Sequence, residues 1–314
     1  MTVKLTHAEV ESDWYGLYRD GWTGILTPEA FSHPAKIAFG LASHIYDHAK
    51  AEGWLRAGDV CVDPFGGIGG CAFQALRHGL TWVGCELEPR WVALAEQNIA
   101  LWNRKYGRLK GWGQARIIHG DSRRLAEVLK PESWNRRAGD FSVGLISSPP
   151  YVAVVSGGGK GIDFSKTKRD GDTSHQNHIH SQGTGQFTYG TSPGQLGSES
   201  GDIFWGASRM ILEQVHAVLR PVGHAIWVLK AFVQKGKIVD FPDQWQALCE
   251  SVGFRTVHVH RAWVVEEHGV QLATDGNHKT HRTERKSFFR RLVEAKGSPR
   301  IDFEVVLCTE ADNA

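Results

Sequence analysis

The sequence has little of what marks membrane, secreted or cross-linked proteins. Its 314 residues contain no apolar run that reaches the roughly 18 residues a membrane span needs. The first residues, MTVKLTHAEVESDW, contain no apolar stretch like that of a secretory signal. The five cysteines are odd in number and scattered, which favours free thiols in a reducing compartment. We therefore expect a cytoplasmic protein that makes no contact with a membrane.

An excess of charge of either sign is also missing. The chain has 36 Lys and Arg against 34 Asp and Glu, a formal net charge of +2. This excludes a protein that coats nucleic acid through its overall charge, so any such contact needs a local basic patch. The hydrophobic content of 41% and the charged content of 22% are ordinary for a globular protein. They exclude a disordered chain, a collagen and a coiled coil.

Strand-like and helix-like patterns alternate along most of the chain. The strand-like runs, short and mostly apolar, lie at 58–65, 81–88, 115–121, 141–151, 223–233, 255–267 and 302–310. Segments with helical periodicity lie between most of them. This alternation predicts an α/β fold whose mostly parallel sheet has helices on both faces. The strand-rich end of the chain predicts an antiparallel strand at one side of that sheet.

Composition divides the chain into four parts. Residues 1–30 form an N-terminal arm with several aromatic side chains, and 31–151 carry the first part of the alternating pattern. Residues 152–202 are rich in Gly, Ser and His and have no period, which predicts a flexible, functional loop. Residues 203–314 carry the remainder of the pattern, with a polar loop expected at 266–284.

A glycine-rich loop, Asp63-Pro64-Phe65-Gly66-Gly67-Ile68-Gly69-Gly70, joins the first of these strands to the helix that follows. Glycines at such a junction let the backbone approach a ligand, and ligands bind at the carboxyl ends of parallel strands. The spacing matches neither the phosphate loop nor the G-x-G-x-x-G dinucleotide pattern. The carboxylate of Asp63 suits a ligand with an ammonium group better than one with a pyrophosphate. The alternative is a helix-start turn that binds nothing.

An acidic residue follows each of the next two strands. Glu86 lies about 20 residues past the loop, where a carboxylate accepts hydrogen bonds from ribose hydroxyls. Its alternative role is that of an acid at a helix N-terminus, which fits Glu88 better. Asp121 is placed either to accept a hydrogen bond from an adenine amino group or to cap the helix that follows it. The sequence leaves both roles of Asp121 open.

The segment Ser147-Ser148-Pro149-Pro150-Tyr151 follows the fourth strand. Its two prolines fix the backbone, so the carbonyl oxygens of this turn point in set directions. The hydroxyl of Ser148, the carbonyl of Pro149 and the ring of Tyr151 together suit a planar group that bears an amine. The amine donates to the two oxygens, and the planar group stacks on the tyrosine. Taken alone, the segment also fits a plain turn at the end of a strand.

In this order on successive strand ends, the residues resemble the amino-methylating, S-adenosylmethionine-dependent DNA methyltransferases, which share the Rossmann-like class I methyltransferase fold. The resemblance implies a catalytic tetrapeptide, Ser148, Pro149, Pro150 and Tyr151. It implies cofactor contacts at Asp63, Phe65, Gly66, Gly67, Gly69, Glu86, Asp121 and Ser148. Phe31-Ser32-His33-Pro34-Ala35-Lys36 is similar to the family segment that holds the methionine end of the cofactor, which adds Phe31, His33, Pro34 and Lys36.

The resemblance implies methyl transfer from S-adenosylmethionine to the exocyclic amine of a flipped-out base in a specific DNA site. Ser148 at the first motif position favours N4 of cytosine, with N6 of adenine as the alternative. Methylation at carbon 5 of cytosine needs a thiolate nucleophile, and no cysteine follows a proline at the turn after the fourth strand. Two further functions stay open, those of an RNA guanine-N2 methyltransferase and of a non-catalytic DNA-binding module.

Double-stranded DNA is the expected partner, and two segments are candidates to contact it. Loop 152–202 either orders on DNA and reads bases or is a passive insertion. Segment 279–291 contains six Lys and Arg against one acid, which suits phosphates or a solvated face beside an edge strand. The loop also contains His175, His178 and His180 without a neighbouring cysteine, and we predict no metal site. The oligomeric state stays open.

Overall fold

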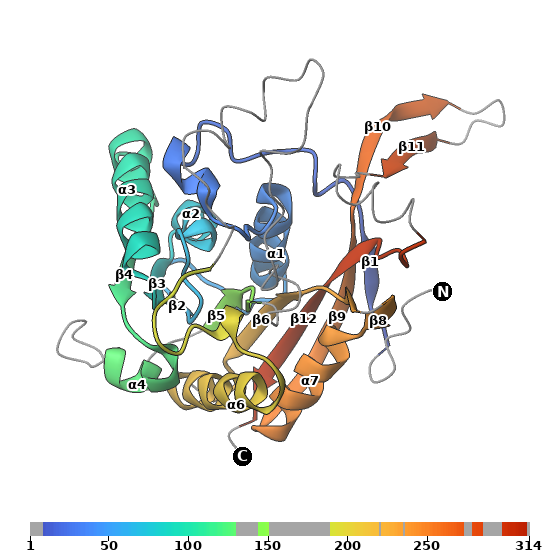
Figure 1. Cartoon of the computed structure of the whole chain (residues 1–314). Helices are drawn as coiled ribbons and strands as arrows, with labels where there is room; N and C mark the ends of the chain where they lie inside the picture. The colour runs from blue at the N-terminus through green and yellow to red at the C-terminus, as the bar shows by residue number, and fades with distance from the viewer. Residues whose placement is uncertain are drawn as a thin grey trace, which may run out of the picture.

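The computed structural model describes residues 9–129, 144–150, 189–219, 221–234, 236–272, 278–284 and 297–312. Eight strands form one sheet in the order β1-β9-β12-β6-β5-β2-β3-β4 (Figure 1). The strands are β1 (Ser12–Trp14), β2 (Val60–Asp63), β3 (Thr81–Glu86), β4 (Gln114–His119), β5 (Gly144–Ser147), β6 (His224–Leu229), β9 (Phe254–Trp263) and β12 (Phe303–Ala311). Strand β12 runs antiparallel to both of its neighbours, while the other pairs are parallel. This arrangement confirms the predicted fold class.

Helices cover both faces of the sheet (Figure 1). One face carries α1 (Phe39–Ala51), α2 (Gly70–Arg77) and α3 (Pro89–Tyr106), and the other carries α4 (Leu125–Val128), α6 (Gly201–Val218) and α7 (Phe241–Ser251). The strands feed both layers because successive side chains point to opposite faces. Cys61 packs in the core under α1 to α3, while its neighbours Val60 and Val62 pack in the core over α6 and α7.

The N-terminal arm is joined to the core by hydrogen bonds from indole groups. Trp102 Nε1 on α3 donates to the carbonyl oxygen of Ile25 at 2.6 Å, and Trp22 Nε1 donates to that of Ile37 at 2.9 Å. The arm also adds β1 to the edge of the sheet, in parallel with β9. A short 3-10 helix, η1 (Pro28–Ser32), leads from the arm into the segment before α1.

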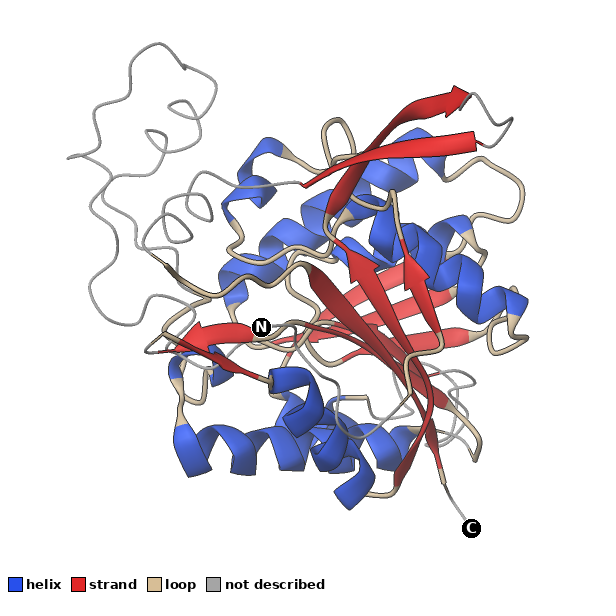
Figure 2. Cartoon of the chain, turned by 90° about the vertical axis from the view of Figure 1, so that its right-hand side faces the viewer, coloured by secondary structure: helices blue, strands red, loops and turns tan. Residues whose placement is uncertain are grey.

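The prediction of a polar loop at 266–284 is wrong. Strands β10 (Val265–Leu272) and β11 (His278–Glu284) form an antiparallel hairpin there, which projects from the body of the molecule (Figure 2). The predicted strand at 223–233 divides into β6 and β7 (Phe232–Gln234), and β7 pairs with β8 (Lys237–Val239). The two errors differ in cause. The strands of the hairpin are polar and lack the apolar pattern on which the prediction relied, whereas the largely apolar run at 223–233 hides the break between β6 and β7.

The predicted flexible loop, 152–202, falls only partly on described residues. Residues 152–188 lie outside them. Residues 189–200 form a turn and the 3-10 helix η5 (Leu196–Ser198), and α6 then begins at Gly201. The last part of that segment is therefore built into the fold, and it contributes to the site described below.

We expect Trp102→Ala to destabilise the protein strongly, because Trp102 is fully buried and ties the N-terminal arm to α3. Loss of a buried tryptophan costs about 3–5 kcal/mol in the free energy of unfolding. Denaturant unfolding measures this change when it is followed by far-ultraviolet circular dichroism, a signal that does not rely on tryptophan fluorescence. Leu109→Ala is the control, because Leu109 is 59% exposed and its loss should change stability by less than about 0.5 kcal/mol. Equal stability of the two variants would contradict the role of Trp102.

Candidate functional site

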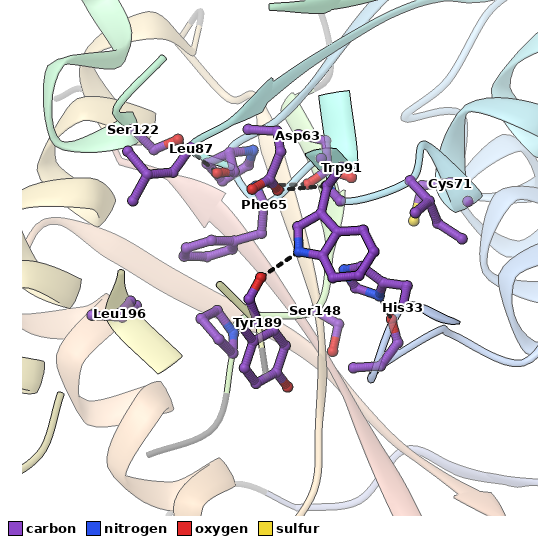
Figure 3. A pocket seen from close by; sticks show the side chains of 18 of the residues that line it. His33, Asp63, Phe65, Cys71, Leu87, Trp91, Ser122, Ser148, Tyr189 and Leu196 are labelled. Atoms are coloured by element: carbon purple, nitrogen blue, oxygen red, sulfur yellow. Dashed lines mark hydrogen bonds between the residues drawn. The ribbon is translucent and has the colours of Figure 1, made fainter. Parts of the chain in front are cut away.

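A cavity of about 390 Å³ lies at the carboxyl ends of the parallel strands. Its wall comes from the segment before α1, the glycine loop after β2, the ends of β3 to β6, the start of β12 and the segment before α6. Figure 3 shows His33, Asp63, Trp91, Ser148 and Tyr189 around this space, although they are far apart in the sequence. This is the edge of an open parallel sheet at which ligands bind.

The glycine loop turns tightly between β2 and α2. Gly67 and Gly69 have φ angles of 51° and 77°, a left-handed conformation that disfavours side chains, and Gly69 is the N-cap of α2. A β-carbon on Gly66 would lie 2.6 Å from Ile117 Cδ1, and one on Gly67 would lie 3.2 Å from His33 Nε2. Close packing against Ile117 and His33 therefore accounts for glycine at these two positions, and both glycines line the cavity.

Asp63 links the glycine loop to the Ser-Pro-Pro turn. Its carboxylate, 2% exposed at the end of β2, accepts hydrogen bonds from Ser147 Oγ at 2.5 Å and from the Phe65 backbone N–H at 3.0 Å. Burial raises the pKa of Asp63 to about 7, because these hydrogen bonds offset only part of the desolvation. Asp63 also lines the cavity. It thus joins the two predicted motifs through one buried carboxyl group.

Glu86 supports the glycine loop from the end of β3. Its carboxylate accepts hydrogen bonds from the backbone N–H groups of Gly67 at 2.9 Å and Glu88 at 2.8 Å, and it lines the cavity. Burial raises its pKa above the ordinary value for a glutamic acid. The carboxylate therefore reaches the cavity while it holds the loop in place.

Asp121 adopts the capping role that the sequence left open. It accepts a hydrogen bond from the Arg123 N–H at 3.0 Å, as N-cap of the 3-10 helix η2 (Ser122–Arg124), and pairs with the Arg123 guanidinium at 2.5 Å. Burial pushes the pKa of Asp121 upward, but the hydrogen bonds from Arg123 outweigh it and hold the pKa below its usual value. Asp121 lines the cavity as well, so capping leaves it within reach of a ligand.

The segment before α1 reaches the glycine loop. His33 is 9% exposed and lies against Gly67, and its ring meets that of Trp91 edge to face at 4.6 Å between centroids. Burial lowers the pKa of His33 to about 4, which keeps its imidazole neutral at pH 7. Lys36 Nζ folds back and donates to the carbonyl oxygens of Phe31 and His33. Lys36 thereby fixes the shape of this segment.

The structure brings most of the predicted site residues to one cavity. His33, Pro34, Lys36, Asp63, Phe65, Gly66, Gly67, Glu86, Asp121, Ser148 and Pro150 line it. Phe31, Gly69 and Pro149 lie beside lining residues but not on the wall itself. Tyr151 lies outside the described residues, so its predicted stacking role stays a prediction.

Sequence reasoning missed one wall of the cavity, the segment 189–196. Trp91, whose pattern in the sequence indicates only helix packing, donates its indole N–H to the carbonyl oxygen of Tyr189 (Figure 3). Glu88 is 4% exposed and accepts from the Ser192 N–H at 2.9 Å and from Gln195 Nε2 at 3.1 Å. The signal for these contacts in the sequence is weak, because Glu88 and Ser192 are 104 residues apart.

A second polar group on the cavity wall was also missed. Lys230, just after β6, lies 3.6 Å from Glu304 at the start of β12, and both residues line the cavity. Tyr18 of the N-terminal arm donates its hydroxyl to Glu304 at 2.8 Å. Only the antiparallel insertion of β12 next to β6 brings these three residues together.

Part of the predicted basic segment 279–291 lies on β11. There the Arg282 guanidinium pairs with Glu267 of β10 at 2.8 Å and lies over the ring of Tyr15 at 3.8 Å from its centroid. Residues 285–291 lie outside the described residues.

Within the part of the chain that the structure describes, no helix has the length and apolar character to cross a membrane.

Comparison with known proteins finds similarity of fold only. No protein-family model and no curated protein matches the sequence. Among solved structures, TrmN from Thermus thermophilus is 14% identical over 90% of this chain, with a TM-score of 0.42. This chain spans about half, 52%, of the length of TrmN.

This chain spans a larger share of two other similar structures. A SAM-dependent methyltransferase from Methanosarcina mazei is 11% identical, with a TM-score of 0.43, over 84% of this chain and 97% of its own. Magnesium protoporphyrin IX methyltransferase from Synechocystis, solved with bound SAM, is 10% identical, with a TM-score of 0.42, over 87% of this chain and 79% of its own.

We expect the buried carboxyl group of Asp63 to make the protein less stable as pH rises. The folded protein keeps a proton on Asp63 up to a pKa of about 7, whereas an ordinary aspartic acid releases it near 3.8. Between these values the folded state binds more protons, so the free energy of unfolding falls by up to about 1.4 kcal/mol per pH unit. Asp63→Asn removes this contribution. Denaturant unfolding at a series of pH values measures it.

The exposed Asp20 supplies the matched control. Asp20→Asn should leave the pH dependence of wild-type stability unchanged, while Asp63→Asn should flatten it between pH 4 and pH 7. If Asp63→Asn follows the wild-type pH dependence, the carboxyl group titrates normally in the folded protein and this account of it is wrong.

Proposed function

We propose that this protein is an S-adenosylmethionine-dependent DNA methyltransferase that methylates an exocyclic amine, with N4 of cytosine preferred. The observation that carries the proposal is the hydrogen bond of 2.5 Å between Ser147 and Asp63. It holds the turn that contains Ser148 and Pro149 against the glycine loop, in one cavity of about 390 Å³. A methyl donor on the loop and an acceptor amine on the turn would then lie side by side.

The cavity residues fit S-adenosylmethionine. Gly66 and Gly67 line the cavity with backbone alone, next to the Glu86 carboxylate that would accept from the ribose hydroxyls. Asp121 would face the adenine amino group. The neutral His33 and the segment up to Lys36 would hold the methionine end. When bound, the cofactor supplies an electrophilic methyl group on a sulfonium.

Ser148 and Pro149 would position the target amine. The amine donates one hydrogen bond to Ser148 Oγ and one to the Pro149 carbonyl oxygen, which draws its lone pair out of conjugation with the ring. Pro149 and Pro150 are buried, so the turn holds both acceptors in place. Holding amine and methyl group in line at short distance supplies much of the rate. The base must leave the duplex to reach this position.

The cysteines favour this chemistry over methylation at carbon 5 of cytosine. All five are buried, and Cys71 is the one that lines the cavity among the described residues. Burial raises the pKa of the Cys71 thiol well above its ordinary value, so it is protonated at neutral pH. A protonated thiol is a poor nucleophile.

We further propose that DNA contacts come from loop 152–202 and from the basic segment 279–291. The first segment leads from the catalytic turn back to Tyr189 and Gln195 on the cavity wall. The second begins on the projecting hairpin, where Glu267 offsets the charge of Arg282. The remaining cations of this segment would meet phosphates.

The proposal predicts a methylated nucleoside in DNA. Unmethylated double-stranded DNA is incubated with the protein and isotopically labelled S-adenosylmethionine, digested, and separated by mass spectrometry. We expect labelled N4-methylcytosine. Labelled N6-methyladenine would show that the target base is adenine, with the same methylation of an exocyclic amine. Labelled product from RNA but not DNA would overturn the DNA substrate, and bound cofactor without any product would indicate a non-catalytic binding protein.

We expect Ser148→Ala to lower turnover by about 100-fold, the usual cost of one positioning hydrogen bond in a transition state. Cofactor affinity, measured by calorimetry, should change little, because the glycine loop and Glu86 would supply most of the cofactor contacts while Ser148 acts chiefly on the amine. Ser251→Ala is the control, since Ser251 is exposed on α7 and bonds to the Leu248 carbonyl oxygen. Full activity of Ser148→Ala, or loss of cofactor binding with it, contradicts the assigned role.

A further inference from the structure

A cluster of His, Glu and Cys side chains, the types that commonly bind metals, lies between α1 and the sheet, away from the cavity. His44 and His48 on α1 and Glu52, the C-cap of this helix, recur every four residues and so share one face. On β9, His258 and His260 point to one face of the sheet, and Cys308 on β12 is the register partner of His258. We call His48, Glu52, His258, His260 and Cys308 the histidine cluster.

The ring nitrogens of the histidine cluster converge on His48. Its Nε2 atom lies 3.3 Å from His258 Nδ1 and 3.3 Å from His260 Nε2. An imidazole nitrogen has either one lone pair or one N–H bond in the ring plane, so it cannot direct a good hydrogen bond at both neighbours. A metal ion can satisfy several lone pairs at once. In a tetrahedral zinc site with bonds of about 2.0–2.1 Å, ligand nitrogens lie about 3.3–3.4 Å apart.

The opposite nitrogen of each of these rings faces an oxygen atom. His260 Nδ1 lies 2.8 Å from Ser12 Oγ, His48 Nδ1 lies 3.9 Å from Glu52 Oε1, and His258 Nε2 lies 3.7 Å from Glu11 Oε2. Metal-bound histidines commonly donate their second N–H to such an oxygen, which fixes the ring and leaves the other nitrogen free to bind. His260 makes this hydrogen bond through Ser12, whereas the carboxylates near His48 and His258 lie beyond hydrogen-bond distance.

Aromatic rings cover part of the histidine cluster. Trp14 stacks on His260 at 4.3 Å between centroids, and Trp54 meets His48 edge to face at 5.4 Å. His260 is 2% exposed and Cys308 is fully buried, so these two members of the cluster have almost no contact with solvent.

Two overlapping sets of ligand atoms share His48. The atoms of His48, His260 and Cys308 lie within 4.8 Å of one another, and so do those of His48, Glu52 and His258. The first set is the more buried one, and its two imidazoles and one thiol are typical of zinc rather than of magnesium or calcium.

We propose that His48, His260 and Cys308 bind one divalent transition-metal ion, with Zn²⁺ as the preferred ion and a water molecule at the open fourth position. Binding releases the proton of the Cys308 thiol to the solvent, because the thiolate is the form that coordinates. The sequence pattern alone does not predict this site, since His48 and His260 lie far apart in the chain.

The bound ion would stabilise the folded protein by linking distant elements. It joins α1, β9 and β12, three elements from opposite ends of the chain. Glu304, which lines the cavity, is four residues from Cys308 along β12, about 13 Å at the spacing of an antiparallel strand. An ion at the cluster is therefore too far away to touch a ligand in the cavity.

The test measures metal binding by purified full-length protein without a polyhistidine tag. After treatment with a chelator, the protein is titrated with Zn²⁺ in a calorimeter, and separately with Co²⁺ in a spectrophotometer. We expect one Zn²⁺ per chain, and with Co²⁺ the visible bands of a tetrahedral site together with a thiolate charge-transfer band. Zn²⁺ should also raise the melting temperature.

Three variants separate the ligands from other histidines. His48→Gln keeps most of the side-chain volume and should weaken Zn²⁺ binding on the order of 100-fold or more, because His48 is common to both ligand sets. Cys308→Ser should abolish the cobalt charge-transfer band while Co²⁺ still binds. His216→Ala is the control, since His216 lies on α6 beside the Gly253 carbonyl oxygen and outside the cluster.

Some outcomes overturn the proposal. Wild-type protein that binds no stoichiometric Zn²⁺, or His48→Gln that binds as tightly as His216→Ala, shows that the cluster is only a packed group of histidines. An unchanged charge-transfer band in Cys308→Ser removes Cys308 from the ligand set. Circular dichroism of each variant verifies that it is folded, so that loss of binding is not loss of structure.

Discussion

The site depends on one buried hydrogen bond, from the Ser147 hydroxyl to the Asp63 carboxyl group. Strands β2 and β5 are neighbours in the sheet, but among the described residues they share a single register pair, Cys61 with Gly144. Beyond that pair, the side-chain contact at 2.5 Å holds the two strand ends together. The loop after β2 and the turn after β5 leave the sheet at this point, so their relative position is set by this contact.

Burial strengthens this hydrogen bond, and it also imposes a desolvation cost on the Asp63 carboxyl group. Asp63 is 2% exposed, and desolvation makes it hold its proton up to a pKa of about 7. Hydrogen bonds from Ser147 and from the Phe65 backbone compensate in part. A second carboxylate, Glu86, supports the same loop from β3 through the Gly67 N–H. Asp63 and Glu86 thus hold the backbone of the glycine loop, whose glycines have no side chains that could make contacts.

The antiparallel strand β12 has a separate structural role. It brings Glu304 beside Lys230 at the cavity and Cys308 beside the histidines of β9. Both groups combine residues from the two ends of the chain. The N-terminal arm adds to each of them, with Tyr18 bound to Glu304 and Ser12 bound to His260. The arm is therefore part of the core rather than an appendage.

The sequence by itself determined the alternating α/β pattern, the glycine loop and the Ser-Pro-Pro turn. These are local features, because strand periodicity, glycine placement and proline act over a few neighbouring residues. It also placed Glu86 and Asp121 at strand ends, where the structure has them. Only the tertiary structure decided that Asp121 caps a 3-10 helix, that Glu88 holds the segment before α6, and that 265–284 is a hairpin. Asp121 caps through Arg123, only two residues away, but its carboxylate also suits a ligand, and only the fold shows which contact it makes. The contacts of Glu88 and of the histidine cluster span 104 and 210 residues, so no local pattern specifies them.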